Sequence, residues 1–172
     1  MIKYQKSSGK IFDVIINIQG DEPFIQQEHL KKIIANFQNS ETQISTLVKE
    51  IKSNEDIFNP DKPKVLINND NFAIYFSRSP VPYLRGVEKK DWHKYHKFYK
   101  HIGIYAYRKD ILEKITLLKP SALEIAESLE QNRWIENGYK ISVNFTNKES
   151  VSVDTKDDLK FIEKNYSEFM ET

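Results

Sequence analysis

Cysteine is absent from the 172 residues of this sequence. Its absence excludes disulfide bonds and thiolate metal sites, and it is typical of proteins in a reducing compartment. The sequence also has no apolar run that approaches the length of a membrane-spanning helix, and residues 1–10 lack the apolar region of a secretory signal. We therefore expect a soluble cytoplasmic protein that does not bind a membrane.

Neither charge sign dominates, because 26 lysine and arginine residues nearly balance 25 aspartate and glutamate residues. Such a chain has no overall field to attract nucleic acid, so its partners must be recognised locally. Residues 83–100 mix basic and aromatic side chains, a pattern that can indicate single-stranded nucleic acid, but Glu88 and Asp91 interrupt it. We favour a flap or a subunit contact for this segment, since aromatic residues are common at interfaces.

The sequence does contain enough apolar material for a core, with 39% hydrophobic and 12% aromatic residues. A chain of this length can bury one sizeable core. No internal repeat, low-complexity tract or linker divides it. We predict a single α/β domain over residues 1–172.

The first predicted strand, from Val14 to Ile18, is followed by a polar turn. Its β-branched run is typical of a buried strand, and the strand stops at Gly20, Asp21 and Pro23. Open α/β sheets place ligands at this kind of strand end. Asp21 is therefore a candidate Mg²⁺ ligand facing a phosphate, although most aspartates that follow a strand only cap a turn.

Apolar spacing predicts the remaining elements. The strand-helix-strand order at the beginning implies a parallel crossover, whereas the turn at 68–71, rich in Asn and Asp, implies an antiparallel hairpin. The fold class we predict is thus α/β, with a mixed, mostly parallel sheet flanked by helices. Predicted helices cover residues 26–39, 111–118, 121–136 and a closing segment ending near 169, and further strands cover residues 44–51, 65–67, 72–76, 101–108 and 141–145.

Two segments carry polar side chains in a regular pattern. In the strand from His101 to Arg108, His101 and Tyr105 share one face, so an imidazole and a phenol can lie side by side over the gap at Gly103. The alternative is a half-buried strand with a solvated face. In the helix that begins at the capping box Ser121 to Glu124, a stripe of polar residues is ordinarily solvated surface. That stripe contains Glu127, Glu130, Gln131 and Trp134.

Five short motifs, taken together, resemble the 3-deoxy-manno-octulosonate cytidylyltransferases, or CMP-Kdo synthetases. The similarity runs from about Asp13 to Leu159. The motifs, in order, are Gln19-Gly20-Asp21-Glu22-Pro23, Tyr75-Phe76-Ser77-Arg78, His101-Ile102-Gly103-Ile104-Tyr105, Leu129-Glu130-Gln131 and Val153-Asp154-Thr155.

The resemblance implies a fold like that of nucleotide-diphospho-sugar transferases. It implies a reaction that joins Kdo, an acidic keto-sugar, to CTP for lipopolysaccharide biosynthesis, in a homodimer formed through about residues 83–100. Mg²⁺ would be held by Asp21 and Asp154, whose carboxylates suit that ion. Capping of the closing helix explains Asp154 about as well.

The resemblance also implies a sugar site. Arg78 offers a planar fork for the sugar carboxylate, although a surface ion pair is an equally reasonable use. Lys100 stands where the family usually has Arg before the matched histidine, which keeps the charge but loses the bidentate geometry. The polar sugar pocket would be completed by Gln19, His101, Tyr105, Glu130 and Gln131.

One departure limits these expectations. Family members begin with a strand and a loop rich in Gly, Arg and Lys that holds the triphosphate, and nothing like it is present here. We therefore expect this polypeptide alone to bind CTP poorly and to turn over slowly or not at all. Alternatives are a non-catalytic sugar-binding or dimerisation fragment, or an enzyme for amino-Kdo or sialic acid. A glycosyltransferase would need a closely spaced Asp-x-Asp after the first strand, which is absent.

Overall fold

The computed structural model of the chain describes residues 12–20, 25–148, 160 and 164. Within these residues, no helix is both long and apolar enough to cross a bilayer. Two 3₁₀ turns, Asn36–Gln38 and Lys89–Asp91, accompany the helices. The strands are β1 (Val14–Asn17), β2 (Ile44–Glu50), β3 (Lys64–Ile67), β4 (Ala73–Ser77), β5 (Tyr99–Arg108) and β6 (Ile141–Phe145). The helices are α2 (Gln27–Ala35), α3 (Asn54–Phe58), α4 (Trp92–Tyr95), α5 (Lys109–Ile115), α6 (Ala122–Glu127) and α7 (Gln131–Glu136).

The strands form one mixed sheet in the order β4-β3-β5-β2-β6, with β1 beside the second half of β5. This confirms the expected mixed sheet. The expectation of mostly parallel pairing is wrong for the described residues, where β2 and β6 are the only parallel neighbours. The reason is β5, which runs antiparallel between β1 and β2. Those two strands keep the same direction, as their strand-helix-strand order predicted, but they are not neighbours.

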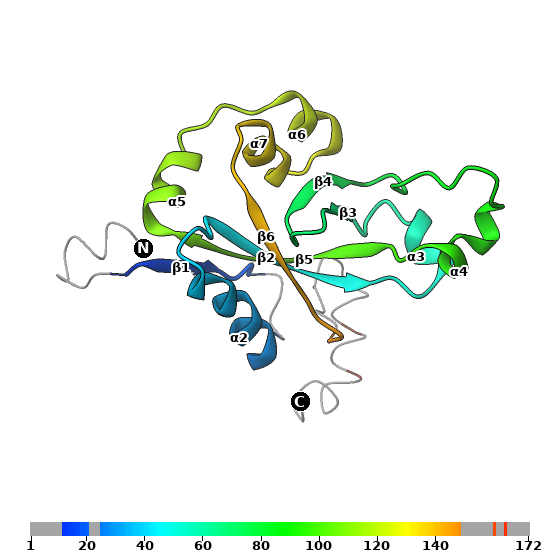
Figure 1. Cartoon of the computed structure of the whole chain (residues 1–172), viewed down its shortest axis with the longest axis horizontal. Coiled ribbons are helices and arrows are strands. Elements are labelled where there is room, and N and C mark those ends of the chain that lie inside the picture. Colours follow the sequence, from blue (N-terminus) through cyan, green and yellow to red (C-terminus); the bar gives the residue numbers. More distant parts are fainter. Residues whose placement is uncertain (1–11, 21–24, 149–159, 161–163, 165–172) are drawn as a thin grey trace.

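Helices cover both faces of the sheet (Figure 1). One core lies under α2 and includes Ile33 with Ile102, Ile104 and Ala106 of β5. The other lies under α5, α6 and α7 and includes Tyr105 and Tyr107. The alternation predicted for β5 is therefore confirmed, because its successive side chains enter opposite cores.

Several elements agree with the sequence. The helix predicted over 26–39 is α2 with its following 3₁₀ turn, and β6 covers the residues predicted for the last strand. The hairpin of β3 and β4 is confirmed: the Asn68 carboxamide oxygen accepts from the backbone N–H of Asp70 and Phe72, and Asn71 adopts a φ of 60°.

The helix predicted over 121–136 is wrong in one respect, since it breaks in the middle. Its capping box is present, with Ser121 accepting from the Glu124 N–H and the Glu124 side chain accepting from the Ser121 N–H. However, Ser128 adopts a left-handed conformation that ends α6 and turns Leu129 into the core. A second helix, α7, then starts at Gln131. The break therefore splits the expected polar stripe between two helices.

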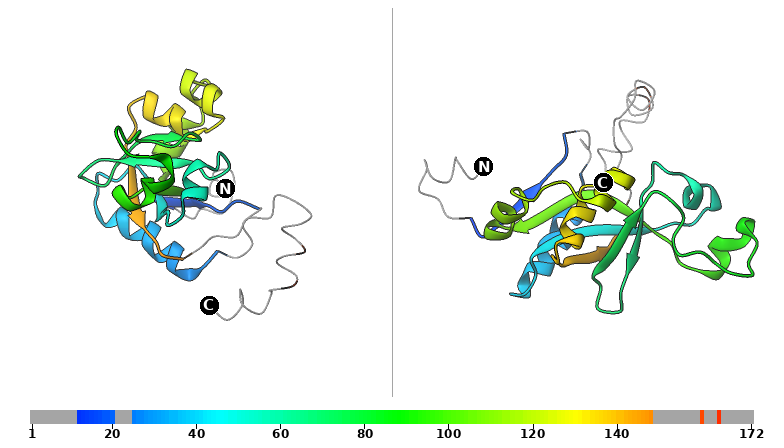
Figure 2. Two further views of the ribbon diagram at one scale, coloured as in Figure 1. Left: turned by 90° about the vertical axis from the view of Figure 1, so that its right-hand side faces the viewer. Right: turned by 90° about the horizontal axis from the view of Figure 1, so that it is seen from above.

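The segment between β4 and β5 extends beyond the rest of the sheet (Figure 2). A small separate core packs it against the segment between β2 and β3, and this core is built from Ile51, Ile57, Trp92 and Phe98. Trp92 is consequently buried, while Tyr83 and Tyr95 remain about 72% exposed. The expected flap or subunit contact stays a prediction.

Candidate functional site

A row of rings on β5 forms the centre of the candidate site. Leu47 of β2 pairs with Ile102 of β5, but the next residue back, Thr46, pairs with Tyr105. The two extra residues of β5 form a bulge, a feature common beside active sites. It leaves His101 and Tyr105 on the same face, with ring centroids 5.0 Å apart.

The Thr46 side chain of β2 stabilises this bulge by hydrogen bonding. Its hydroxyl lies 2.8 Å from the carbonyl oxygen of Ile104 and 3.0 Å from Nε2 of His101. Because the hydroxyl hydrogen goes to the carbonyl, we assign the histidine hydrogen to Nε2, with Thr46 as its acceptor. Nδ1 of the ring is then an acceptor.

His101 is neutral in this environment. Its ring packs edge-on against Phe76, with centroids 5.2 Å apart, and burial lowers the pKa of His101 to about 3. A neutral imidazole can orient a hydroxyl group by hydrogen bonding, but it brings no positive charge to a carboxylate.

Tyr105 offers an unused polar group. The side chain is buried, and no described residue forms a hydrogen bond with its hydroxyl. Burial, and next the nearby Tyr107, raise the pKa of Tyr105 well above its usual value, so the phenol keeps its proton. A buried hydroxyl without a partner costs stability, so its presence needs an explanation. Binding of a polar ligand is one such explanation.

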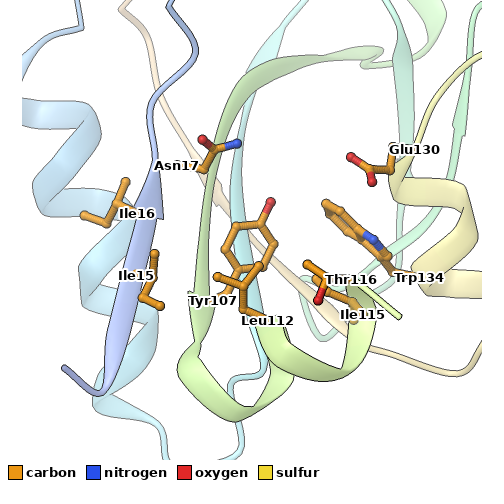
Figure 3. Close-up of a pocket in the computed structure, with 9 residues that line it drawn as sticks. All are labelled: Ile15, Ile16, Asn17, Tyr107, Leu112, Ile115, Thr116, Glu130 and Trp134. Atoms are coloured by element: carbon orange, nitrogen blue, oxygen red, sulfur yellow. The ribbon is translucent and has the colours of Figure 1, made fainter. Parts of the chain in front are cut away.

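A hollow of about 350 Å³ opens beside this row (Figure 3). Trp134 of α7 forms one wall and packs edge-on against Tyr105 at 5.1 Å and Tyr107 at 5.6 Å. Asn17 and Glu130 lie at the polar rim (Figure 3). The lining residues are Ile15, Ile16, Asn17, Tyr107, Leu112, Ile115, Thr116, Glu130 and Trp134.

The predicted residues Glu130 and Gln131 lie where α7 begins. Glu130 is exposed, and its carboxylate is 3.7 Å from the Arg133 guanidinium. Gln131 is only 6% exposed. The structure thus brings Glu130 to the hollow that Tyr107 and Trp134 line, next to the ring row of His101 and Tyr105.

The Arg78 guanidinium is not free to bind a sugar carboxylate, because it already donates hydrogen bonds to the protein. Its guanidinium donates to the carbonyl oxygens of Glu127 at 2.8 Å, Pro60 at 3.1 Å and Ser128 at 3.4 Å. The bonds to Glu127 and Ser128 connect the end of β4 to the turn between α6 and α7, and the bond to Pro60 connects it to the loop between α3 and β3. Binding of a sugar carboxylate by Arg78 stays a prediction, and it would require some of these bonds to be exchanged.

The sequence did not identify Glu127 as the residue that joins α6 to the end of β4. Its carboxylate accepts from the Tyr75 hydroxyl at 2.7 Å, the Ser77 hydroxyl at 2.8 Å and the Arg78 backbone N–H at 2.8 Å. The only sequence signal was its place in the polar stripe. That signal assigned it to the same face as Glu130, whereas the turn at Ser128 directs it to β4.

The metal prediction falls outside the described residues. Asp21 and Asp154 both lie there, while Gln19 is described and exposed just after β1. Among the described residues, no group of three or more His, Asp or Glu side chains is arranged to hold a metal ion. Mg²⁺ binding at Asp21 and Asp154 therefore stays a prediction.

The chain is similar to known cytidylyltransferases. A family model described as cytidylyltransferase matches residues 2–141. The 3-deoxy-manno-octulosonate cytidylyltransferase of Parabacteroides distasonis is 54% identical over 160 residues, covering 91% of this chain and 63% of the relative. The protein of the same name from Cytophaga hutchinsonii is 55% identical, covering 91% of this chain and 62% of the relative. The chain thus spans less than two thirds of the length of these relatives.

A solved structure extends the comparison to three dimensions. It is described as CMP:2-keto-3-deoxy-manno-octonic acid synthetase complexed with CTP, and it is 31% identical to this chain. The match has a TM-score of 0.84 and covers 97% of this chain and 66% of that chain. The α/β fold expected from the sequence is therefore confirmed, except for the mostly parallel pairing of its strands.

Proposed function

Because this chain belongs to the cytidylyltransferase family, we propose that it provides the acidic-sugar site of a CMP-Kdo synthetase. In that reaction the anomeric hydroxyl oxygen of Kdo attacks the α-phosphate of CTP. A new oxygen-phosphorus bond forms, pyrophosphate leaves, and the hydroxyl proton is lost. Reactions of this class depend mainly on in-line placement of the reactants and on neutralisation of charge.

The observation that carries the proposal is the ring row on β5 beside the start of α7. A sugar presents several hydroxyl groups, which need both donors and acceptors. Neutral His101 supplies an acceptor at Nδ1, and Tyr105 supplies a hydroxyl that no described residue uses. Glu130 adds a carboxylate at the rim of the adjoining hollow. We assign these three residues to the sugar, with Gln131 and Gln19 as further polar groups.

We further propose Mg²⁺ as the cofactor, held by Asp21 and Asp154. The support is chemical, because two carboxylates with water suit this ion. When bound, the ion would orient the triphosphate and make the attacking hydroxyl more acidic. The use of CTP agrees with a cytoplasmic location. A homodimer through residues 83–100 is supported by the exposed Tyr83 and Tyr95.

Binding of Kdo to the isolated chain, measured by calorimetry, tests the sugar site without requiring turnover. Replacing Tyr105 with phenylalanine removes one hydroxyl that can bond to the sugar, and we expect affinity to fall about tenfold, as for loss of one buried hydrogen bond. Tyr99→Phe is the matched control, because Tyr99 lies on the same strand and packs against Phe145. Equal Kdo affinity of the unchanged chain, Tyr105→Phe and Tyr99→Phe would refute the assignment of Tyr105 to the sugar.

The fraction of the relatives that this chain spans favours a second candidate, a non-catalytic sugar-binding or dimerisation fragment. Melting temperature separates the two functions. If CTP and Mg²⁺ raise it together more than either does alone, a nucleotide-metal site is present and an enzyme is favoured. If Kdo raises the melting temperature but CTP and Mg²⁺ do not, the non-catalytic fragment is favoured.

A further inference from the structure

The bulge in β5 gathers several polar atoms around one side chain of β2. Thr46 is fully buried. Its hydroxyl oxygen lies 2.8 Å from the carbonyl oxygen of Ile104, 3.3 Å from that of Ile102 and 3.0 Å from Nε2 of His101. Ile102 and Ile104 stand on either side of Gly103, within the stretch where β5 has two residues more than β2. The bulge therefore lets a single hydroxyl meet two carbonyl groups of the same strand and an imidazole.

These neighbours decide where the hydrogen atoms lie. A threonine hydroxyl has one hydrogen to donate, and its oxygen can accept. Carbonyl oxygens can only accept, so both compete for the Thr46 hydrogen, and the shorter distance favours Ile104. The opposite arrangement, in which Thr46 donates to Nε2, would take that hydrogen from both carbonyl groups. Thr46 is therefore an acceptor toward the imidazole, and His101 carries its hydrogen on Nε2.

Burial makes the choice of tautomer strict. The His101 ring is neutral, and Phe76 packs edge-on against it. A buried N–H without an acceptor is costly, so Nε2 keeps its hydrogen only while Thr46 accepts it. The bond made by one ring nitrogen thereby fixes the state of the other, and Nδ1 keeps its lone pair. Nδ1 is the atom that the proposed function assigns to a sugar hydroxyl.

We propose that Thr46 is a positioning residue of the sugar site, which holds the His101 imidazole in the tautomer whose Nδ1 accepts from a sugar hydroxyl. The inference rests on the proposed function, because it deepens the assignment of His101 to the sugar. Thr46 is buried, so it acts on the sugar through the imidazole. Removal of its hydroxyl should change the tautomer, and the affinity for the sugar should fall as a consequence.

Three variants separate this role from a purely structural one. Thr46→Val keeps the branched shape of the side chain and removes its hydroxyl. Thr46→Ser keeps the hydroxyl and should behave like the unchanged chain. Thr42→Val is the matched control, because Thr42 is also buried and its hydroxyl donates to the Asn36 carbonyl at 2.7 Å rather than to β5. Circular dichroism and melting temperature verify that each variant is folded.

The tautomer of His101 can be measured by ¹⁵N NMR at neutral pH, because the protonated and unprotonated nitrogens of a neutral imidazole differ in chemical shift. The spectrum of His101→Gln identifies the signals of this ring. We expect a hydrogen on Nε2 in the unchanged chain, in Thr46→Ser and in Thr42→Val. In Thr46→Val the hydrogen should move to Nδ1, because a buried Nε2–H would lack an acceptor.

Kdo affinity, measured by calorimetry, tests the consequence for the sugar. Thr46→Val should weaken binding about tenfold, as for loss of one hydrogen bond. Thr46→Ser and Thr42→Val should bind Kdo as the unchanged chain does. In a His101→Gln background, Thr46→Val should cause no further loss, because residues that act through one another are not additive.

Two results would overturn the inference alone. If His101 keeps its hydrogen on Nε2 in Thr46→Val, another group sets the tautomer. If the unchanged chain binds Kdo and Thr46→Val binds it equally well, the tautomer does not matter for the sugar. Absence of Kdo binding by the unchanged chain would instead overturn the proposed function together with the role of Thr46 in it.

Discussion

The two sides of α7 differ in how completely their polar groups are used. Toward β4, Asn132 is fully buried and forms hydrogen bonds with both backbone groups of Phe76, accepting at 3.2 Å and donating at 2.9 Å. Glu127 and Arg78 complete this corner, with three bonds to the carboxylate and three from the guanidinium. Nearly every polar group here has a partner.

The opposite side of α7 is incomplete. Trp134 faces the apolar hollow, Glu130 is exposed at its rim, and the Tyr105 hydroxyl has no partner among the described residues. One short helix thus has a rigid attachment on one side and unused groups on the other. We call the hydrogen-bonded side, with Asn132, Glu127 and Arg78, the frame, and the other side, with Trp134, Glu130 and Tyr105, the site. Precise binding groups need a support whose own hydrogen bonds are satisfied, so the frame can hold the site in place. Stability should therefore depend on the frame, and binding on the site.

Replacing Asn132 with leucine should break the frame most strongly. The change leaves the N–H and C=O of Phe76 buried without partners, each costing about 1–3 kcal/mol. We expect the free energy of unfolding, measured by urea denaturation, to fall by about 3 kcal/mol. The control is Asn137→Ala, since Asn137 is exposed and bonds only to the nearby Arg133 carbonyl among described partners. If the free energy of unfolding falls no more than it does in the control, the two Asn132 hydrogen bonds do not stabilise this side of α7.

The frame also contains a costly group, Lys64, whose ammonium is fully buried and donates to the Asn59 carbonyl at 2.7 Å. Burial lowers the pKa of Lys64 to about 8, and the Glu127 carboxylate opposes this shift. Burial likewise lowers the pKa of Lys100 to about 8, with Lys62 and Lys49 adding to the effect.

These lowered pKa values predict that stability rises with pH. Between about pH 8 and the unfolded value of about 10.4, the unfolded state binds more protons than the folded state, so raising the pH favours folding. Each lysine should contribute a slope of at most about 1.4 kcal/mol per pH unit, and below pH 8 its contribution should be flat. Urea denaturation from pH 7 to 10 measures this, and Lys64→Met should reduce the slope. An unchanged slope in that variant would exclude Lys64 as a source.

Features built from local pattern could be predicted from the sequence. Alternation identified both faces of β5, and the Ser121–Glu124 capping box marked the start of α6. The left-handed turn at Ser128 could not be predicted, because its stability depends on burying Leu129 and on the distant bonds from Arg78. No spacing rule contains such contacts, since they join residues about fifty positions apart.

The candidate site shows the same division. His101 and Tyr105 could be paired on one face from their spacing alone, and the structure places their rings 5.0 Å apart. Thr46, which supports the bulge between them, carried no signal, because a threonine in a buried strand is unremarkable in sequence. Its role follows only from the register of β2 against β5.

Tyr105→Phe should have the smallest effect on stability and thereby sharpen the contrast between frame and site. Its hydroxyl has no described partner, so its removal orphans no donor or acceptor and removes a buried unpaired group, and the free energy of unfolding should not fall. Thr46→Val is the comparison, because it removes a hydroxyl that bonds to His101 and to the Ile104 carbonyl, with an expected loss of about 1–2 kcal/mol. Urea denaturation of both variants measures the difference. A large loss in Tyr105→Phe would show that the hydroxyl belongs to the frame, and it would remove the main argument for a ligand at that position.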